Sequence, residues 1–184
     1  MQSLAVLITH LINQLSGRLP LLDKNLIAVS AYGIPLLVLV VALQWWRSGD
    51  RMAVRHVLLS AGFAFLLGLG INQLVLMFFD RVRPYETGVT HLLIAPSADP
   101  SFPSDHSTAA MAIAASFLLS GALRTQGLFL LAAAVLVAFS RVYVGIHYVG
   151  DVLGGAAIGT VAALFVSLLF RPGGRLSKVL VRIL

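Results

Sequence analysis

Long apolar stretches separated by short polar segments run along the chain, and this pattern predicts helices that cross a membrane. An α-helix needs about 20 apolar residues to span the hydrocarbon core of a bilayer. Five stretches approach or exceed that length. We expect spans at Leu26–Trp46, Val54–Phe79, Thr108–Ser120, Leu128–Phe139 and Val152–Phe170, with the third and fourth extended by neighbouring residues.

The two ends of the chain follow a different pattern. Residues 1–20 mix apolar with polar positions, which is typical of a helix lying in the membrane interface; a sixth span is the alternative. Residues 172–184 alternate basic with apolar positions and predict an amphipathic tail on anionic lipid. We therefore expect one integral-membrane domain over residues 1–184, an all-α polytopic membrane helical bundle with about five to six transmembrane helices.

The composition agrees with this interpretation. Of the 184 residues, 59% are apolar and only 11% are charged, with a mean hydropathy of +0.94, whereas soluble domains carry about 25% charged residues. The chain has no cysteine, which excludes disulfides, thiol nucleophiles and cysteine-ligated metals. Its N-terminus has neither a basic segment nor a small-residue cleavage site, so we expect no cleaved signal peptide.

The net charge of +6 is explained by the positions of the basic residues relative to the membrane, so we expect no nucleic-acid partner. If the spans alternate, eight cations lie on one side of the membrane, and the positive-inside rule makes that side cytoplasmic. They are Arg47, Arg51, Arg55, Arg124, Arg171, Arg175, Lys178 and Arg182. The C-terminus is then cytoplasmic, and the polar clusters described next face the extracytoplasmic side.

Three polar clusters interrupt the apolar pattern. They are Arg83-Pro84, then Pro103-Ser104-Asp105-His106, then Ser140-Arg141 followed by His147 and Asp151. An ionisable side chain within a bilayer costs about 2.5–3.5 kcal/mol and usually marks a functional site. Arginine suits phosphate because its guanidinium group binds two oxygens at once. The clusters therefore indicate chemistry on a phosphate group at one membrane face.

Each cluster taken alone also has a plainer interpretation. His147 and Asp151 share a helix face at a spacing of four. The carboxylate could fix the imidazole tautomer for nucleophilic attack, or the two could form a structural pair. His106 could be a general acid or a polar helix cap, and Arg83 and Arg141 could be interface cations. The histidines and carboxylates have no recognisable metal-ligand spacing, so we expect no metal ion and no other cofactor.

The order and spacing of the clusters resemble the type 2 phosphatidic acid phosphatase superfamily, lipid phosphatases that share a core with vanadium haloperoxidases. That family's signature is Lys-x6-Arg-Pro, Pro-Ser-x-His and Ser-Arg-x5-His-x3-Asp; the second motif is present at 103–106 and the third at 140–151. One position departs from it, because Leu76 stands where the signature has lysine, and we expect Arg81 to compensate. Within the superfamily, residues 79–85 and 97–106 resemble the bacitracin-resistance (BcrC-type) undecaprenyl-diphosphate phosphatases.

The resemblance implies a catalytic mechanism in two steps. His147 would attack the terminal phosphorus and form a phosphohistidine, with Asp151 orienting its ring. His106 would protonate the departing lipid phosphate and then activate water. The phosphate would be held by Arg83, Ser104, Arg141, Arg81 and Ser140, and His91 and Asp99 would contact the second phosphate.

It also implies a membrane lipid substrate, undecaprenyl diphosphate, and a place in the bacterial inner (plasma) membrane. Hydrolysis would recycle the cell-wall carrier lipid and confer bacitracin resistance. Alternatives in the same fold are a phosphatase of phosphatidic acid, phosphatidylglycerophosphate or a shorter prenyl diphosphate, a lipid phosphotransferase, and a degenerate family member without activity. A non-catalytic transporter or channel is a further alternative, although polar clusters at span ends favour surface chemistry over conduction. No pattern in the sequence predicts an oligomeric state.

Overall fold

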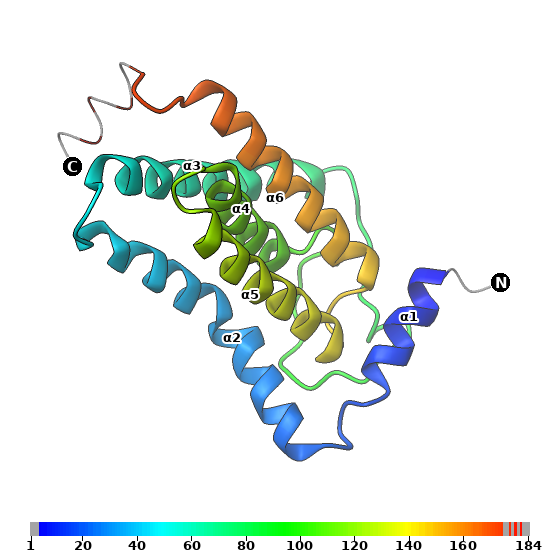
Figure 1. Ribbon diagram of the computed structural model, residues 1–184. Helices are drawn as coiled ribbons and strands as arrows, with labels where there is room; N and C mark the ends of the chain where they lie inside the picture. Colours follow the sequence, from blue (N-terminus) through cyan, green and yellow to red (C-terminus); the bar gives the residue numbers. More distant parts are fainter. Residues whose placement is uncertain (1–3, 175–176, 178, 180, 182–184) are drawn as a thin grey trace.

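The computed structural model describes residues 4–174 together with Ser177, Val179 and Val181, and within these residues all regular structure is helical (Figure 1). The elements in chain order are α1 (Leu4–Asn13), α2 (Pro20–Leu43), the short 3-10 helix η1 (Gln44–Trp46), α3 (Arg51–Leu76), α4 (Asp105–Leu119), α5 (Arg124–Tyr143) and α6 (Val149–Leu169). The expected all-α membrane bundle is confirmed.

Local sequence features explain where several helices begin. Proline stands in the first turn of α2, where its fixed φ suits a helix and its missing N–H costs nothing. Asp50 caps α3 by accepting a hydrogen bond from the Ala53 amide at 3.0 Å, satisfying a backbone donor that the helix itself leaves unpaired. At α6, the Asp151 carboxylate accepts from the Tyr148 amide at 2.8 Å, so a predicted site residue also fixes the start of a helix.

Helix α4 is the centre of the bundle, and α3, α5 and α6 pack around it (Figure 1). Its alanines Ala110, Ala112 and Ala114 are almost completely buried, since small side chains let the neighbouring backbones come close. Gly159 of α6 lies directly against the Thr108 carbonyl of α4, where a Cβ atom would not fit. This close packing holds the first turn of α4, which carries His106, rigidly against α6.

Helices α2 and α3 meet at η1 and diverge from there, with α4 and α5 lying between them (Figure 1). Helix α2 packs mainly against α5, whereas α3 packs against α4 and α6. The two consecutive helices therefore form a V whose narrow end is at η1 and whose wide end is near the C-terminus of α3.

Four segments are long and apolar enough to cross a membrane: Pro20–Trp46, Arg51–Leu76, Arg124–Tyr143 and Val149–Leu169. They correspond to four of the five predicted spans. The remaining prediction, Thr108–Ser120, falls on α4, which has 15 residues and is shorter than a bilayer requires. Many apolar side chains on the outer helices are exposed, Leu66, Phe129 and Leu169 among them, as lipid contact requires. The chain is a multi-pass membrane protein.

The two ends carry the remaining predictions about the fold. The expected interfacial segment 1–20 contains α1, a short apolar helix of 10 residues, and its position in the membrane interface stays a prediction. The expected basic tail at 172–184 lies largely outside the described residues. Of its described part, Ser177 bonds to His56 of α3 at 2.8 Å.

Candidate active site

A cavity of about 210 Å³ opens where α3 and α5 end and α4 begins. It is lined by Gln73, Leu76, Arg83, Ser97, Asp99, Pro100, Pro103, Asp105, His106, Arg141 and His147. The lining contains residues from all three polar clusters, although these lie up to 64 positions apart in the sequence. The cavity is therefore the place at which the predicted chemistry can be tested residue by residue.

His147 lies in the connection between α5 and α6 and is almost completely buried. Its Nδ1 atom is 2.8 Å from the carbonyl oxygen of Ser101. A carbonyl oxygen only accepts hydrogen bonds, so Nδ1 carries the proton and Nε2 keeps a free lone pair. Burial lowers the pKa of His147, and Asp151 opposes this shift. The ring has the neutral form and the tautomer that a nucleophile needs.

Asp151 is fully buried in the first turn of α6, and its carboxylate accepts three hydrogen bonds. Oδ2 accepts from the Ser101 hydroxyl at 2.5 Å and the Tyr148 amide at 2.8 Å, and Oδ1 accepts from Arg81 at 2.7 Å. The distance from Oδ2 to His147 Nδ1 is 3.6 Å, too long for a hydrogen bond. The carboxylate thus holds Ser101, and the carbonyl of Ser101 holds the imidazole.

Arg83 is buried, and most of its N–H groups donate hydrogen bonds to the loops around the cavity. Nε donates to the Asp99 carbonyl at 2.8 Å, Nη1 to the Ile146 carbonyl at 3.0 Å, and Nη2 to Ser97 Oγ and the Pro100 carbonyl. A guanidinium group has five N–H donors, so a single N–H of Nη1 has no partner within the described residues. Arg83 ties the long loop to the His147 connection and keeps its positive charge at the cavity.

Arg141 and Ser104 have buried donors that are not used. Arg141 donates from Nη1 to the Ser30 hydroxyl of α2 at 2.5 Å, but its buried Nε has no partner in the described part of the chain. The Ser104 hydroxyl is likewise fully buried and unpaired there, but Ser104 is not among the residues that line the cavity. An unpaired buried donor costs about 1–3 kcal/mol, and an anion bound in the cavity would remove that cost at Arg141.

His106 stands in the first turn of α4 and lines the cavity. Burial, together with the nearby Arg141 and His147, lowers the pKa of His106 to about 4. Its imidazole is therefore neutral at pH 7 while the cavity holds no anion. A bound phosphate would offset the charge of Arg141 and favour the protonated ring.

Besides Ser104, two residues that the sequence assigned to phosphate binding do not line the cavity. Arg81 pairs with Asp151 and places its guanidinium group over the Tyr148 ring at 4.2 Å, and it is not among the residues lining the cavity. The Ser140 hydroxyl donates to the Val137 carbonyl of its own helix at 2.7 Å. Their roles in phosphate binding stay predictions. Of the two loop residues expected at the second phosphate, Asp99 lines the cavity and His91 does not.

Several residues at the site were not predicted. Leu76 lines the cavity where the signature has lysine, and Gln73 lines it one helical turn earlier. Asn72 is fully buried and donates to Asp105 Oδ1 at 2.6 Å, and it also bonds to the Thr108 hydroxyl. Gln73 and Asn72 are polar residues inside an apolar span, a signal that could have found them. Within the described residues, no three histidine or carboxylate side chains gather as a metal ion would require.

Comparison with known proteins agrees with this geometry. The PAP2 superfamily pattern matches residues 57–174. The undecaprenyl-diphosphatase BcrC of Bacillus subtilis (strain 168) is 36% identical over 82% of this chain and 76% of its own. Among solved structures, LpxE of Aquifex aeolicus has a TM-score of 0.71 and 26% identity, covering 90% of this chain and 95% of LpxE.

A second solved structure is the first transmembrane PAP2-type phosphatidylglycerolphosphate phosphatase from Bacillus subtilis. It has a TM-score of 0.65 and 26% identity, covering 95% of this chain and 90% of that one. The family match includes His106, Arg141, His147 and Asp151 and spans the helices that build the cavity. The chain therefore belongs to the PAP2 superfamily, and it is a lipid phosphatase of the membrane.

Proposed function

We propose that this protein hydrolyses undecaprenyl diphosphate to undecaprenyl phosphate and inorganic phosphate through a phosphohistidine at His147. One observation carries the mechanism: His147 is held with Nε2 unprotonated at a cavity where the buried Nε of Arg141 has no partner in the described part of the chain. The similarity to BcrC supports the choice of substrate.

In the first step, the lone pair of His147 Nε2 attacks the terminal phosphorus. The bond from that phosphorus to the bridging oxygen breaks, and the departing undecaprenyl phosphate takes a proton from His106. Arg83, Arg141 and Ser104 stabilise the charge that spreads over the equatorial oxygens, which is the main catalytic contribution in phosphoryl transfer. The diphosphate brings the negative charge that raises the pKa of His106 and lets it carry this proton.

In the second step, water attacks the phosphorus of the phosphohistidine. His106, now neutral, accepts a proton from that water as the P–N bond breaks, and Nε2 recovers its lone pair. Inorganic phosphate leaves, and both histidines return to their starting forms. Asp151 contributes through Ser101, which holds the imidazole at the angle required for both steps.

The distribution of charge supports one orientation in the membrane. Arg51 begins α3 and Arg124 begins α5, and both helices end at the cavity. Arg47 and Arg171 lie in the connections at that same far end of the bundle. The positive-inside rule supports a cytoplasmic position for this end. The cavity then faces the extracytoplasmic side of the bacterial inner membrane, where it would recycle the cell-wall carrier lipid and confer bacitracin resistance.

The test is phosphate release by the purified protein in detergent with EDTA, using undecaprenyl diphosphate, phosphatidic acid and phosphatidylglycerophosphate in parallel. We expect the prenyl diphosphate to be the preferred substrate and His147→Ala to abolish its turnover. Equal or faster turnover of the glycerophospholipids would overturn the substrate, and this outcome has some support in the likeness to a phosphatidylglycerolphosphate phosphatase. Activity that persists in His147→Ala would overturn the mechanism.

A further inference from the structure

The catalytic cavity contains a carboxylate that has no role in the two chemical steps. Asp105 lies in the first turn of α4 and lines the cavity together with His106, at a position that the family signature leaves open. Its Oδ1 atom accepts a hydrogen bond from Asn72 Nδ2 at 2.6 Å, and its Oδ2 atom has no hydrogen-bond partner among the described residues. One oxygen of the carboxylate is therefore fixed, and the other can accept a hydrogen bond from a ligand.

Asn72 of α3 fixes the direction in which this carboxylate points. Asn72 is fully buried, and its Nδ2 atom also donates to the Thr108 hydroxyl at 2.9 Å. Both N–H bonds of the amide nitrogen are thus used. Because Asn72 presents a donor to the side chain at position 105, the atom that faces Asn72 there must be an acceptor.

Electrostatics alone do not explain a carboxylate at this place. Positive charge favours the binding of phosphate, yet Asp105 and Asp99 line the same cavity as Arg83 and Arg141. Neither arginine forms an ion pair with Asp105, and both ion pairs that the described residues form involve Asp151 instead. A carboxylate in this position repels phosphate oxygens, so its presence requires a benefit at another step of the reaction.

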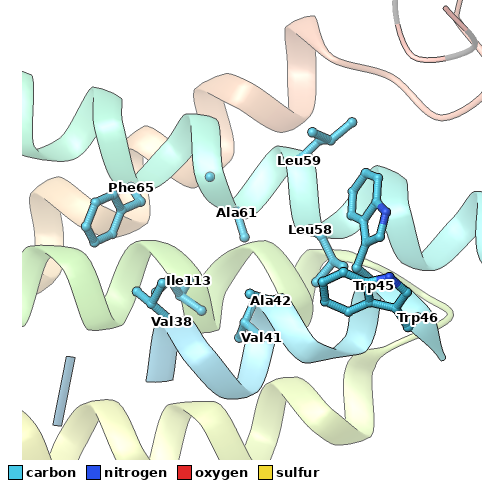
Figure 2. A pocket seen from close by; sticks show the side chains of 11 residues that line it. Val38, Val41, Ala42, Trp45, Trp46, Leu58, Leu59, Ala61, Phe65 and Ile113 are labelled. Carbon is cyan, nitrogen blue, oxygen red and sulfur yellow. The ribbon is translucent and has the colours of Figure 1, made fainter. Parts of the chain in front are cut away.

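The surroundings of α4 leave few other hydrogen-bond acceptors close to His106. About two turns further along the same helix, Ile113 lines the apolar groove that Figure 2 shows, together with Val38 and Phe65. Within the described residues, no side-chain acceptor lines that groove. Acceptors for a reacting water must therefore come from the cavity itself, and of its two carboxylates Asp105 is the one on the same helical turn as His106.

We propose that Asp105 orients the water that hydrolyses the phosphohistidine, and so favours water over an alcohol as the acceptor of the phosphoryl group. This inference rests on the proposed function, since it requires a phosphohistidine at His147. Water has two O–H groups. One points to His106, the general base, and the other donates to Asp105 Oδ2, so a lone pair of the water oxygen points at phosphorus. An alcohol has a single O–H group, and its alkyl group would lie against the carboxylate.

Asp105 is unchanged by the hydrolytic step. The water oxygen forms a bond to phosphorus while the P–N bond breaks, and the electron pair of the P–N bond returns to Nε2 of His147. One water proton passes to His106. The second proton stays on the oxygen, which becomes the hydroxyl group of inorganic phosphate and keeps its hydrogen bond to Asp105. The carboxylate therefore acts as a hydrogen-bond acceptor and takes up no proton.

The substitution Asp105→Asn changes the hydrogen-bonding role of one atom with little change of shape. Its amide oxygen must face the donor of Asn72, so its amide nitrogen takes the place of Oδ2. The cavity then presents an N–H donor where the water needs an acceptor. Asp99→Asn is the matched control, because it removes the same charge from the same cavity and leaves Asp105 in place.

The measurement is the partition of the phosphoryl group between water and methanol. Undecaprenyl diphosphate labelled in its terminal phosphate is added to protein in detergent with methanol, and labelled inorganic phosphate and methyl phosphate are separated. We expect Asp105→Asn to raise the ratio of methyl phosphate to inorganic phosphate at least about tenfold, as the loss of a hydrogen bond to a charged group predicts. The ratio in Asp99→Asn should equal that of wild type. Because a ratio does not depend on the fraction of folded protein, a loss of stability would not imitate this result.

The outcomes separate this inference from the proposed function. If wild-type protein hydrolyses undecaprenyl diphosphate and Asp105→Asn has the same ratio, Asp105 does not orient the water, while the proposed function stands. An equal rise in Asp105→Asn and Asp99→Asn also overturns the inference, because the effect would follow from the loss of charge.

A second substrate covers the case in which the proposed lipid is wrong. If wild-type protein does not hydrolyse undecaprenyl diphosphate, the same ratio is measured with labelled p-nitrophenyl phosphate. A ratio raised only in Asp105→Asn would then support the role of Asp105 although the proposed substrate fails. Wild-type protein that releases phosphate from neither substrate overturns both proposals.

Discussion

The carbonyl oxygen of Ser101 accepts a hydrogen bond from His147 Nδ1 at 2.8 Å, while the hydroxyl of the same serine donates to Asp151 at 2.5 Å. Ser101 is fully buried between the two. The histidine and the aspartate of the third motif are therefore connected through a residue from the long loop. A main-chain carbonyl fixes the imidazole tautomer, and the buried carboxylate fixes that carbonyl.

Replacing Ser101 by alanine tests this connection. Ser101→Ala keeps the carbonyl but removes the hydroxyl that anchors it to Asp151, so the imidazole should be less well oriented. We expect kcat to fall about tenfold, as is typical when a supporting hydrogen bond of a functional histidine is lost, with KM little changed. Steady-state kinetics on undecaprenyl diphosphate provide the measurement, and a kcat equal to that of wild type would contradict the connection.

His106→Ala should separate the two chemical steps. With p-nitrophenyl phosphate the leaving group needs no proton, so phosphorylation of His147 should continue. Hydrolysis of the phosphohistidine should slow by about 10²–10⁴-fold, since the base that activates water is missing. Acid-quenched protein would then retain labelled phosphate that wild-type protein releases. His147→Ala is the control and should carry no label; label in that variant would place the nucleophile elsewhere.

Arg81 was predicted to bind phosphate, but in the structure it pairs with Asp151. Arg81→Ala distinguishes between these two roles. A role in phosphate binding requires KM to rise. The ion pair of Arg81 with Asp151 at 2.7 Å leads us to expect a lower kcat instead, because the carboxylate that holds Ser101 loses one of its partners. Michaelis constants for undecaprenyl diphosphate decide between the two. A rise in KM at constant kcat would show that Arg81 binds phosphate although it does not line the cavity.

Much of the fold could be predicted because long apolar stretches are typical of helices that cross a membrane. The ends of the helices were harder to predict, since they depend on caps such as Asp50 and on the Asp151–Tyr148 bond. Helix α4 shows the limit of hydropathy. Its alanine-rich sequence is apolar because other helices enclose it. A count of apolar residues does not distinguish a helix buried among other helices from a helix in contact with lipid.

The motifs predicted that Arg83, His106, Arg141 and His147 would gather, and all four line one cavity. What they could not indicate is which atoms make the contacts. Arg83 binds the carbonyls of Asp99 and Ile146, and His147 binds that of Ser101. Every residue has a carbonyl, so the sequence carries no signal for these bonds. The sequence therefore suggested Asp151 alone as the partner of His147, whereas Nδ1 lies 2.8 Å from the Ser101 carbonyl and 3.6 Å from Asp151 Oδ2.

The lowered pKa of His106 makes folding depend on pH. In the folded state it is about 4, below the usual value near 6.5, so the unfolded chain binds more protons between these two values. Stability therefore falls as the pH drops through this window. We expect His106 to cost about 2 kcal/mol at pH 5 relative to pH 7. His147, whose pKa burial also lowers, acts in the same direction.

Thermal unfolding in detergent at pH 7 and pH 5 measures this dependence. The Tm of the wild-type protein should be lower at pH 5, and His106→Gln should reduce the difference, because glutamine does not titrate. Inorganic phosphate should raise the Tm by pairing with Arg141 and Ser104. A Tm difference that is the same in His106→Gln and in wild type would assign the pH dependence to other groups.

Helix α1 stabilises the connection between α5 and α6, which contains His147. Asn13 is buried and donates to the carbonyls of Tyr143 at 2.8 Å and His91 at 3.0 Å, and it accepts from the His91 amide at 2.7 Å. Four residues earlier, the buried Thr9 accepts from the Val149 amide at 3.0 Å. These bonds hold the chain on both sides of His147, so α1 should influence catalysis although it does not line the cavity.

Asn13→Ala should therefore lower both stability and turnover. It leaves buried backbone groups unpaired, which costs about 1–3 kcal/mol for each, and it frees the connection next to His147. We expect kcat to fall, with KM for undecaprenyl diphosphate little changed. His10→Ala is the matched control, since His10 lies on the same helix but is exposed and its side chain bonds only to the Val89 carbonyl within the described residues. Its kcat and Tm should equal those of wild type, whereas an Asn13→Ala protein with unchanged kcat would limit α1 to a role in folding.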